Sequence, residues 1–189
     1  MRGAEDALAR LCDPAAEVSA HYMIGSCGTL WQMVAEDQRA WHAGAGAWQG
    51  LQDINSRSIG VELVNSGAQP FSAPQMQRLE ALLGALMQRW AIPADAVIGH
   101  SDMAPDRKED PGPKFDWPLL ARQGLAVWPE GLGPDVALAQ SLDQIGYPPS
   151  DPEKRLQAFR FRFFPTATGP ETTRDRRRAA CVAATLRWA

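Results

Sequence analysis

The sequence predicts an α/β fold followed by a small unit of three helices. Three observations support this: short apolar strands alternate with a long amphipathic helix before residue 128, the composition changes near 128–131, and three helical patterns follow. The 189 residues correspond to one domain, or to one domain with a small addition. Hydrophobic residues at 45% and charged residues at 22% are typical of globular proteins, which excludes a wholly disordered, collagen-like or coiled-coil chain.

In chain order, the expected elements are a helix over 4–11, strands over 18–24, 29–34 and 58–64, a helix over 73–90, a short buried strand at 97–98, and helices over 135–145, 151–164 and 171–187. The first helix places Leu8 and Leu11 on one face. The first two strands are joined by a turn at 25–28 and form a hairpin. Residues 40–50, rich in Trp and Gly and without a period, are expected to form an ordered loop of the kind that carries sites.

The helix over 73–90 has the clearest signals. Ser72 can cap its N-terminus, Gln75 completes a capping box, and Pro93 stops the helix. Apolar residues at helical spacing form one stripe along it: Met76, Leu79, Leu82, Leu83, Leu86, Met87 and Trp90. The stretch from His100 to Trp117 is rich in Pro, Asp and Lys and is expected to be a loop.

The composition change divides the chain into two expected units. We predict a domain over 1–128 and a three-helix module over 134–189, joined by an exposed hinge at about 129–134. The charge run Asp175–Arg178 is expected to be a solvated face of the last helix.

Charge and cysteine content exclude several function classes. Nineteen basic and 22 acidic residues give a net charge of −3, so a strongly cationic nucleic-acid binder is not expected. No apolar run reaches the ~18 residues of a membrane span, and residues 1–6 contain no apolar signal region. Cys12, Cys27 and Cys181 form no C-x-x-C pair, so we expect buried thiols rather than disulfides or a thiolate zinc cluster.

Histidine is scarce, and His100 has the most suggestive surroundings. It is expected to end a buried strand, and Asp110 follows ten residues later in a constrained loop, so the two side chains can converge on one ion. Imidazole nitrogen and carboxylate oxygen both suit zinc, and Lys108 beside them could stabilise a negatively charged oxygen. The alternative is structural: His100 caps the strand end and the acidic loop is a solvated turn.

Glu62 is unusual because it lies inside an apolar strand. Val61 and Leu63 face one side, so Glu62 faces the other side together with Gly60 and Val64. Gly60 leaves room for a ligand to approach the sheet. Glu62 is therefore either a half-exposed sheet residue or a general base whose pKa is raised by burial.

Five blocks of sequence, taken together, resemble one enzyme family. The blocks are Val18–Ile24, Arg39–Gly44, Asn55–Leu63, Gly99–Pro105 and Arg107–Trp117. They resemble the type 2 N-acetylmuramoyl-L-alanine amidases, relatives of the animal peptidoglycan recognition proteins, over about residues 1–128. The remaining chain resembles the three-helix peptidoglycan-binding module of one branch of that family, through Gly146-Tyr147, Ala158-Phe159 and Gly169.

This resemblance implies an α/β fold with a mixed β-sheet flanked by helices and a small three-helix module. It implies zinc-dependent hydrolysis of the amide between N-acetylmuramic acid and L-alanine in peptidoglycan or muropeptides. Carried over by position, His100 and Asp110 would be zinc ligands, Glu62 the catalytic base, and Lys108 the group that stabilises the oxyanion. His42 and Trp48 lie in the loop expected to border the glycopeptide cleft, and they are expected to bind substrate.

The resemblance also implies a further zinc ligand. In this family a histidine closes an N-terminal strand just before the segment with which this sequence starts, and neither strand nor ligand is present here. Of the two other histidines, His21 is the better substitute. Two hypotheses follow: an amidase whose native chain is longer, or a non-catalytic protein that binds peptidoglycan fragments.

The expected partner is peptidoglycan or a muropeptide, with no nucleic acid and no transmembrane segment, and the expected state is a monomer. Family members that carry the helical module tend to be envelope proteins. We therefore expect the cell envelope or periplasm rather than the cytoplasm.

Overall fold

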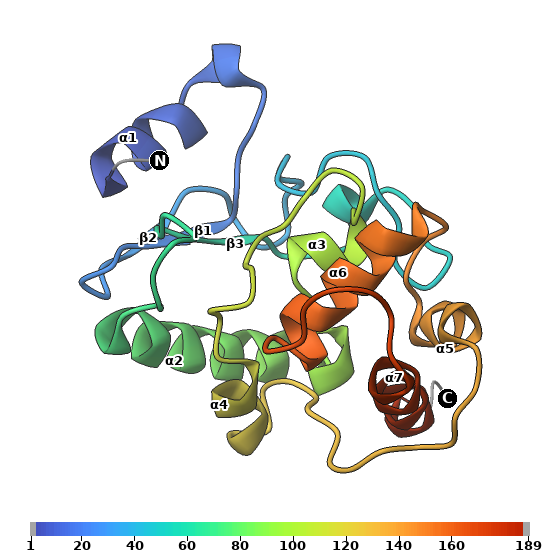
Figure 1. Cartoon of the computed structure of the whole chain (residues 1–189). Helices are drawn as coiled ribbons and strands as arrows, with labels where there is room; N and C mark the ends of the chain where they lie inside the picture. The colour runs from blue at the N-terminus through green and yellow to red at the C-terminus, as the bar shows by residue number, and fades with distance from the viewer. Residues whose placement is uncertain (1–2, 187–189) are drawn as a thin grey trace.

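The computed structural model describes residues 3–186 (Figure 1). Its helices and strands are α1 (Ala4–Leu11), β1 (Tyr22–Ile24), β2 (Leu30–Gln32), β3 (Val61–Leu63), α2 (Ala73–Trp90), α3 (His100–Met103), α4 (Trp117–Arg122), α5 (Leu138–Ile145), α6 (Pro152–Phe163) and α7 (Thr173–Thr185). Short 3₁₀ turns lie at Pro14–Ala16, Ile54–Ser56 and Ala94–Ala96. The end of the last predicted helix, at 187, lies outside the described residues.

The sheet is mixed, as the resemblance implied. The strand order is β2-β1-β3; β1 pairs with β2 in antiparallel and with β3 in parallel orientation. Met23 lies opposite Trp31 on one side and opposite Glu62 on the other. Each strand has three residues and is shorter than predicted, because the flanking residues pair with loops: the amide of Ser19, for example, donates to the carbonyl of Trp41 at 3.1 Å.

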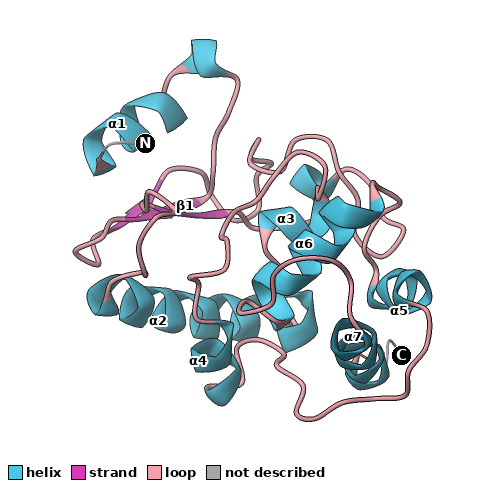
Figure 2. Cartoon of the chain, viewed as in Figure 1, coloured by secondary structure: helices cyan, strands magenta, loops and turns pink. Residues whose placement is uncertain are grey.

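Helices cover both faces of this sheet. In Figures 1 and 2, α1 lies above the strands and α2 below them. Met23 packs with Ala7 and Leu11 of α1, whereas Tyr22 and Ile24 belong to the cluster formed with the buried residues of α2. The alternation predicted for the third strand is confirmed, because Val61 and Leu63 pack against the α2 cluster and Val64 packs against the α1 cluster.

The helix α2 has the predicted limits, but its predicted capping box is only half formed. The hydroxyl of Ser72 accepts a hydrogen bond from the amide of Gln75. The Gln75 side chain does not return it; its amide group donates instead to the carbonyls of Ile24 (2.8 Å) and Val64 (3.1 Å). Gln75 therefore ties α2 to the ends of β1 and β3, which explains why a polar side chain is fully buried there.

The prediction of a strand at 97–98, with His100 at its end, is wrong. A 3₁₀ turn at Ala94–Ala96 precedes these residues, and His100 opens the short helix α3 within the stretch expected to be a loop. The polar groups of this segment are held by side chains rather than by a sheet partner, since Asp102 accepts a hydrogen bond from the amide of Gly99 at 2.8 Å and Arg162 donates to the carbonyl of Val97 at 2.8 Å.

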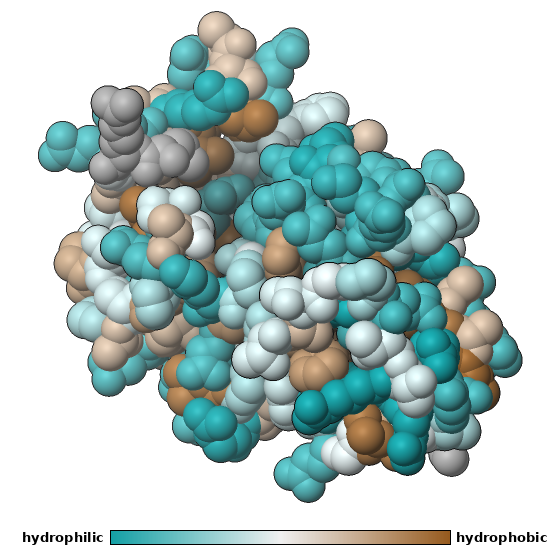
Figure 3. All heavy atoms as spheres, viewed as in Figure 1, coloured by the Kyte–Doolittle hydropathy of each residue, from teal (hydrophilic) through white to brown (hydrophobic). Residues whose placement is uncertain are grey.

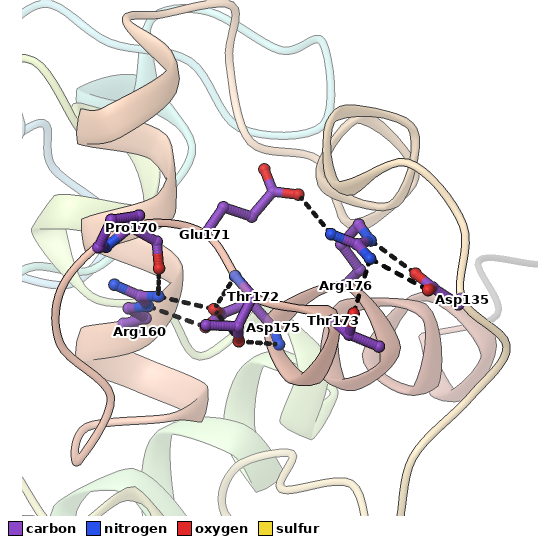
Figure 4. Close-up of polar contacts among 8 residues, drawn as sticks. All are labelled: Asp135, Arg160, Pro170, Glu171, Thr172, Thr173, Asp175 and Arg176. Atoms are coloured by element: carbon purple, nitrogen blue, oxygen red, sulfur yellow. Dashed lines mark hydrogen bonds and ion pairs between the residues drawn. The ribbon is translucent and has the colours of Figure 1, made fainter.

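The helices α5, α6 and α7 confirm the three predicted C-terminal helices; all three start later than predicted, α6 and α7 end earlier, and α5 ends at the predicted residue. Their buried residues share one hydrophobic cluster with Trp48, Ile54 and Met103 from the first 128 residues. The division into two units stays a prediction. Asp175 contradicts the expectation of a solvated face, because it is fully buried and ion-paired with Arg160 (Figure 4).

Two further surface features are clear. Cys12 and Cys27 are exposed and Cys181 is half-buried, so the prediction of three buried thiols is wrong: Cys12 follows the end of α1, Cys27 lies in a turn, and Cys181 lies within α7 but is only partly covered. On the face shown in Figure 3, hydrophobic residues occupy small separate areas among hydrophilic ones. None of the helices in residues 3–186 is long and apolar enough to cross a membrane.

Candidate active site

The side chains of His100 and Asp110 meet, as predicted. The Nδ1 atom of His100, at the start of α3, lies 3.1 Å from Oδ2 of Asp110 in the following loop. A backbone hydrogen bond from the amide of Ser101 to the carbonyl of Asp110, at 2.9 Å, fixes the loop against the helix. Desolvation acts to raise the pKa of Asp110, but the hydrogen bond with His100, the charges of His100 and Lys108 and a backbone hydrogen bond together keep the pKa below its ordinary value.

The loop over 40–50 sets the orientation of the His100 ring. Its Nε2 atom lies 2.9 Å from the carbonyl of Ala43, which can only accept, so Nε2 carries the proton in the neutral ring. Arg107 donates to the same carbonyl at 2.7 Å, and the buried Asn55 side chain accepts from the amides of His42 and Ala43. The position of the acceptor is therefore fixed from both sides.

This orientation bears directly on metal binding. In the neutral ring the Nδ1 lone pair faces a carboxylate oxygen at 3.1 Å, and two acceptors at this distance require a proton or a metal ion between them. Two ligand atoms about 2.1 Å from a zinc ion at a tetrahedral angle lie about 3.4 Å apart. The pair formed by His100 and Asp110 therefore fits a zinc ion. Within residues 3–186, no group of three or more His, Cys, Asp or Glu side chains could hold a metal.

Glu62 lies close enough to His100 and Asp110 for their charges to shift its pKa. It sits in the middle of β3, half-buried, with its backbone opposite Met23. Burial raises the pKa of Glu62 above its ordinary value, and the negative charge of Asp110 acts in the same direction, while His100 and Lys108 act against it. Lys108 also lowers the pKa of Asp110. The structure thus brings His100, Asp110, Glu62 and Lys108 together.

The other two histidines occupy different places. The rings of His21 and His42 lie edge to face with 5.6 Å between their centres. Burial, followed by the charge of His21, lowers the pKa of His42 to about 4, so its ring is neutral at pH 7. Its Nε2 atom is buried and has no hydrogen-bond partner among the described residues. This leaves His42 with an unused polar atom beside Glu62's strand, since a Cβ on Gly60 would lie 2.2 Å from the His42 ring.

His21 is not a third metal ligand in this structure. It is buried, its Nδ1 atom accepts from the amide of Gly60 at 3.0 Å, and its Nε2 atom donates to the carbonyl of Gln38 at 2.9 Å. With both nitrogens in use inside the protein, neither lone pair is free for a metal. His21 is a structural residue that joins the start of β1 to the start of β3.

Trp48 is not part of the group around His100. Its side chain is 7% exposed, belongs to the core cluster of the C-terminal helices, and packs edge to face against Tyr147 with 5.2 Å between ring centres. That location suits packing of the 40–50 loop. The predicted role of Trp48 in substrate binding stays a prediction, as does that of His42.

The site contains residues that the sequence did not single out. Asn55, Arg107, Asp102, Arg162 and Tyr147 all support the segments that carry His100 and Asp110. Asp102, Arg162 and Tyr147 are buried, and the contacts between them span 45 and 60 residues of sequence; the exposed Arg107 reaches Ala43 across 64 residues. No local pattern indicates such contacts.

The fold and the site together define a class of protein. A histidine–aspartate pair whose spacing fits a metal ion, a carboxylate with a raised pKa and a lysine, close to the edge strand of a mixed sheet, are the groups expected of a hydrolase in which a metal ion and a carboxylate base activate water.

Comparison with known proteins identifies the family. The family model for N-acetylmuramoyl-L-alanine amidase matches residues 1–113. The chain is 34% identical to N-acetylmuramoyl-L-alanine amidase AmiD of Escherichia coli over 198 residues, covering 86% of this chain and 71% of AmiD. It is 44% identical to 1,6-anhydro-N-acetylmuramyl-L-alanine amidase AmpD of Enterobacter cloacae over 100 residues, about half of each protein. The chain belongs to the N-acetylmuramoyl-L-alanine amidase family, which confirms the resemblance.

Solved structures agree over nearly the whole chain. The complex of Escherichia coli AmiD with the substrate anhydro-N-acetylmuramic acid-L-Ala-D-γ-Glu-L-Lys matches with a TM-score of 0.88 and 31% identity, covering 96% of this chain and 84% of AmiD. AmpDh3 of Pseudomonas aeruginosa in complex with an anhydromuramic pentapeptide matches with a TM-score of 0.79 and 26% identity, covering 96% and 85%. The C-terminal helices are therefore part of the shared fold.

Proposed function

We propose that this protein is a zinc-dependent N-acetylmuramoyl-L-alanine amidase that hydrolyses the amide between N-acetylmuramic acid and L-alanine in muropeptides. The observation that carries the proposal is the meeting of the His100–Asp110 pair with Glu62 and Lys108 in a member of this family. These side chains come from three separate segments of the chain. Packing of the hydrophobic core does not require polar side chains from these segments to lie together.

Each of the four side chains has a distinct role. His100 and Asp110 would hold the zinc ion through Nδ1 and a carboxylate oxygen; a bound zinc ion would polarise the scissile carbonyl and make water more acidic. Glu62 takes a proton from the attacking water and later returns it to the leaving amine. Its raised pKa makes its carboxylate a stronger base than an ordinary glutamate. The Lys108 ammonium stabilises the negative charge that develops on the carbonyl oxygen.

The substrate class follows from the relatives. AmiD and AmpDh3 are solved with anhydromuramic peptides, so we propose a soluble anhydro-muropeptide as substrate and peptidoglycan recycling as the process. We also propose that the protein acts as a monomer in the cell envelope, where the three-helix module aids attachment to the wall.

The test is release of the stem peptide from anhydro-N-acetylmuramyl-L-Ala-D-γ-Glu-L-Lys, measured by chromatography with and without added zinc. Zinc-dependent cleavage that disappears in Glu62→Ala, while the variant keeps the wild-type melting temperature, supports the proposal. A folded wild-type protein that retains zinc and releases no peptide would contradict it.

One observation favours a second candidate, a muropeptide-binding protein without catalysis. Residues 3–186 supply two protein ligands for zinc rather than the three of ordinary catalytic sites. Isothermal titration calorimetry with the same muropeptide, in the presence of a chelator, separates the candidates. Tight binding without zinc and without turnover indicates the binding protein.

A further inference from the structure

The side chain of Asp102 is the structural centre of the segment that carries His100. It is fully buried, two residues after His100 in α3. Its two oxygens accept three hydrogen bonds: Oδ2 from the amide of Gly99 (2.8 Å) and from Arg162 (2.8 Å), and Oδ1 from the hydroxyl of Tyr147 (2.7 Å). A buried carboxylate with this many donors has its orientation fixed.

Two of these three donors come from the C-terminal helices. Arg162 lies in α6 and Tyr147 follows α5, 60 and 45 residues away from Asp102 in sequence. The helices α3 and α6 lie against each other (Figure 1). The Tyr147 hydroxyl is so deeply buried that desolvation raises its pKa well above the ordinary value, so it stays protonated and acts as a hydrogen-bond donor to Asp102 at physiological pH.

Arg162 forms hydrogen bonds at both ends of the segment over 97–102, which contains His100. One guanidinium nitrogen donates to Asp102, after His100, and another donates to the carbonyl of Val97, before it, at 2.8 Å. The Arg162 side chain is 2% exposed and its guanidinium lies 4.6 Å above the ring of Trp117. A guanidinium held in this way keeps the residues between 97 and 102 in one arrangement.

We propose that Arg162 and Tyr147 are positioning residues for the metal site: the C-terminal helices hold His100 in place through Asp102. This inference rests on the proposed function, in which His100 binds zinc. It assigns to these helices a catalytic support role in addition to any contact with the cell wall. A ligand whose backbone can shift binds the ion less tightly, because metal affinity depends on ligands fixed before the ion arrives.

The chain contains a matched control two residues away on the same helix. Arg160 is 7% exposed and forms a bidentate ion pair with the buried Asp175, as Figure 4 shows, and it also donates to the carbonyls of Gly169 and Pro170. This pair joins α6 to the start of α7, and its hydrogen bonds go to residues 169–175 rather than to the segment around His100. Loss of Arg160 therefore removes a buried ion pair without touching the site.

The experiment compares Arg162→Met, Tyr147→Phe and Arg160→Met in the whole chain. For each variant we measure the melting temperature, the zinc dissociation constant by competition with a chromogenic chelator, the absorption spectrum of the cobalt(II)-loaded protein, and kcat and KM. Binding and kinetics are measured well below the lowest melting temperature. Tyr147→Phe removes one hydroxyl from a packed ring and keeps the test valid where Arg162→Met fails to fold.

We expect Arg162→Met to weaken zinc binding about 10-fold or more, in the range found for groups that support metal ligands, and to change the cobalt spectrum. Tyr147→Phe should weaken zinc binding less, and both variants should lower kcat while KM stays constant. Arg160→Met should lower the melting temperature alone. Arg162→Lys, which can donate to Asp102 without the second fixed donor, should restore part of the zinc affinity.

Equal zinc affinities in wild type, Arg162→Met and Tyr147→Phe would overturn the inference while leaving the proposed function standing. The same holds if Arg160→Met weakens zinc binding as much as Arg162→Met, since the effect would then be general loss of stability. A wild-type protein that binds neither zinc nor cobalt(II) would overturn the inference and the proposed zinc site together.

Discussion

Replacing Gly60 by alanine should destabilise the protein and disturb the site through one steric contact. Gly60 precedes β3, and a Cβ built there would lie 2.2 Å from Cγ and 2.6 Å from two other atoms of the His42 ring. Carbon atoms in favourable contact lie about 3.5–4.0 Å apart, so either the ring or the strand must move by more than about 1 Å.

Neither partner can move freely. The amide of Gly60 donates to His21 at 3.0 Å, and the carbonyl of Gly60 accepts from the amides of His21 and Tyr22, both at 3.1 Å. The backbone of His42 is held by Asn55. Overpacking of a fixed region costs about 1–3 kcal/mol. For a chain of this size that corresponds to a melting temperature lower by about 2–12 °C.

The assay is thermal denaturation at pH 7, with Gly84→Ala as the control. Gly84 lies within α2, where a new Cβ meets one side-chain atom at 4.0 Å, so alanine should stabilise the helix by about 0.5–1 kcal/mol. The double variant Gly60→Ala/His42→Ala should recover part of the loss because the clash is gone. A melting temperature of Gly60→Ala equal to or above the wild-type value would refute the reasoning.

Three further predictions concern single charged groups. Glu62→Gln should lower kcat about 10²–10⁴-fold. In the wild type, kcat/KM should fall as the pH drops through the raised pKa of Glu62, because the base must be ionised; a kcat/KM that stays constant as the solution is acidified would contradict this. Lys108→Ala should lower kcat about 10²–10³-fold with little change in KM, whereas a change in KM alone would show that it binds substrate instead. Glu36 accepts hydrogen bonds from Tyr22, Arg89 and Trp90, and although desolvation acts to raise its pKa these contacts lower it to about 2. Because the pKa of Glu36 is lower in the folded than in the unfolded protein, the ionised Glu36 stabilises the fold above pH 4.5, and this stabilisation is lost as the pH falls toward 2. Glu36→Gln should therefore lower the melting temperature at pH 7, and the difference from the wild type should shrink as the pH falls from 4.5 toward 2.

The helices of eight or more residues were predicted well because their signals are local, whereas the short helices α3 and α4 were not predicted. The limits of α1 and α2 follow from apolar spacing and from the cap at Ser72. The strands were predicted too long, since a sheet strand ends where its partners end, and a single sequence pattern does not contain that information. The strand predicted at 97–98 failed for the same reason: an apolar pair before Gly99 has no sheet partner, and the buried guanidinium of Arg162 satisfies its backbone instead.

The site residues were predicted for a different reason. Spacing alone left the roles of His100, Asp110, Glu62 and Lys108 open, and the resemblance to the amidase family assigned a role to each. Physical reasoning could place Glu62 on the face away from Val61 and Leu63, but the distance between His100 and Asp110 depends on a loop fold. The residues that hold this loop and helix, such as Asn55 and Arg162, are polar in sequence and buried in structure. Composition predicts such residues on the surface, so only the three-dimensional contacts reveal their role.

The supporting contacts around His100 suggest why the C-terminal helices share a core with the rest of the chain. The carbonyl of Ala43 fixes the His100 ring, and Asp102 fixes the backbone of the preceding residue, Gly99, so a shift at either place changes the direction of Nδ1. The first constraint comes from the 40–50 loop, and the second comes from Arg162 in α6 and from Tyr147, two residues after α5. Trp48 packs on Tyr147, so these two sources of support also contact each other. Loosening the C-terminal helices should therefore affect both constraints on the ligand at once, and a catalytic site that needs its groups held to within about 0.5 Å is sensitive to both.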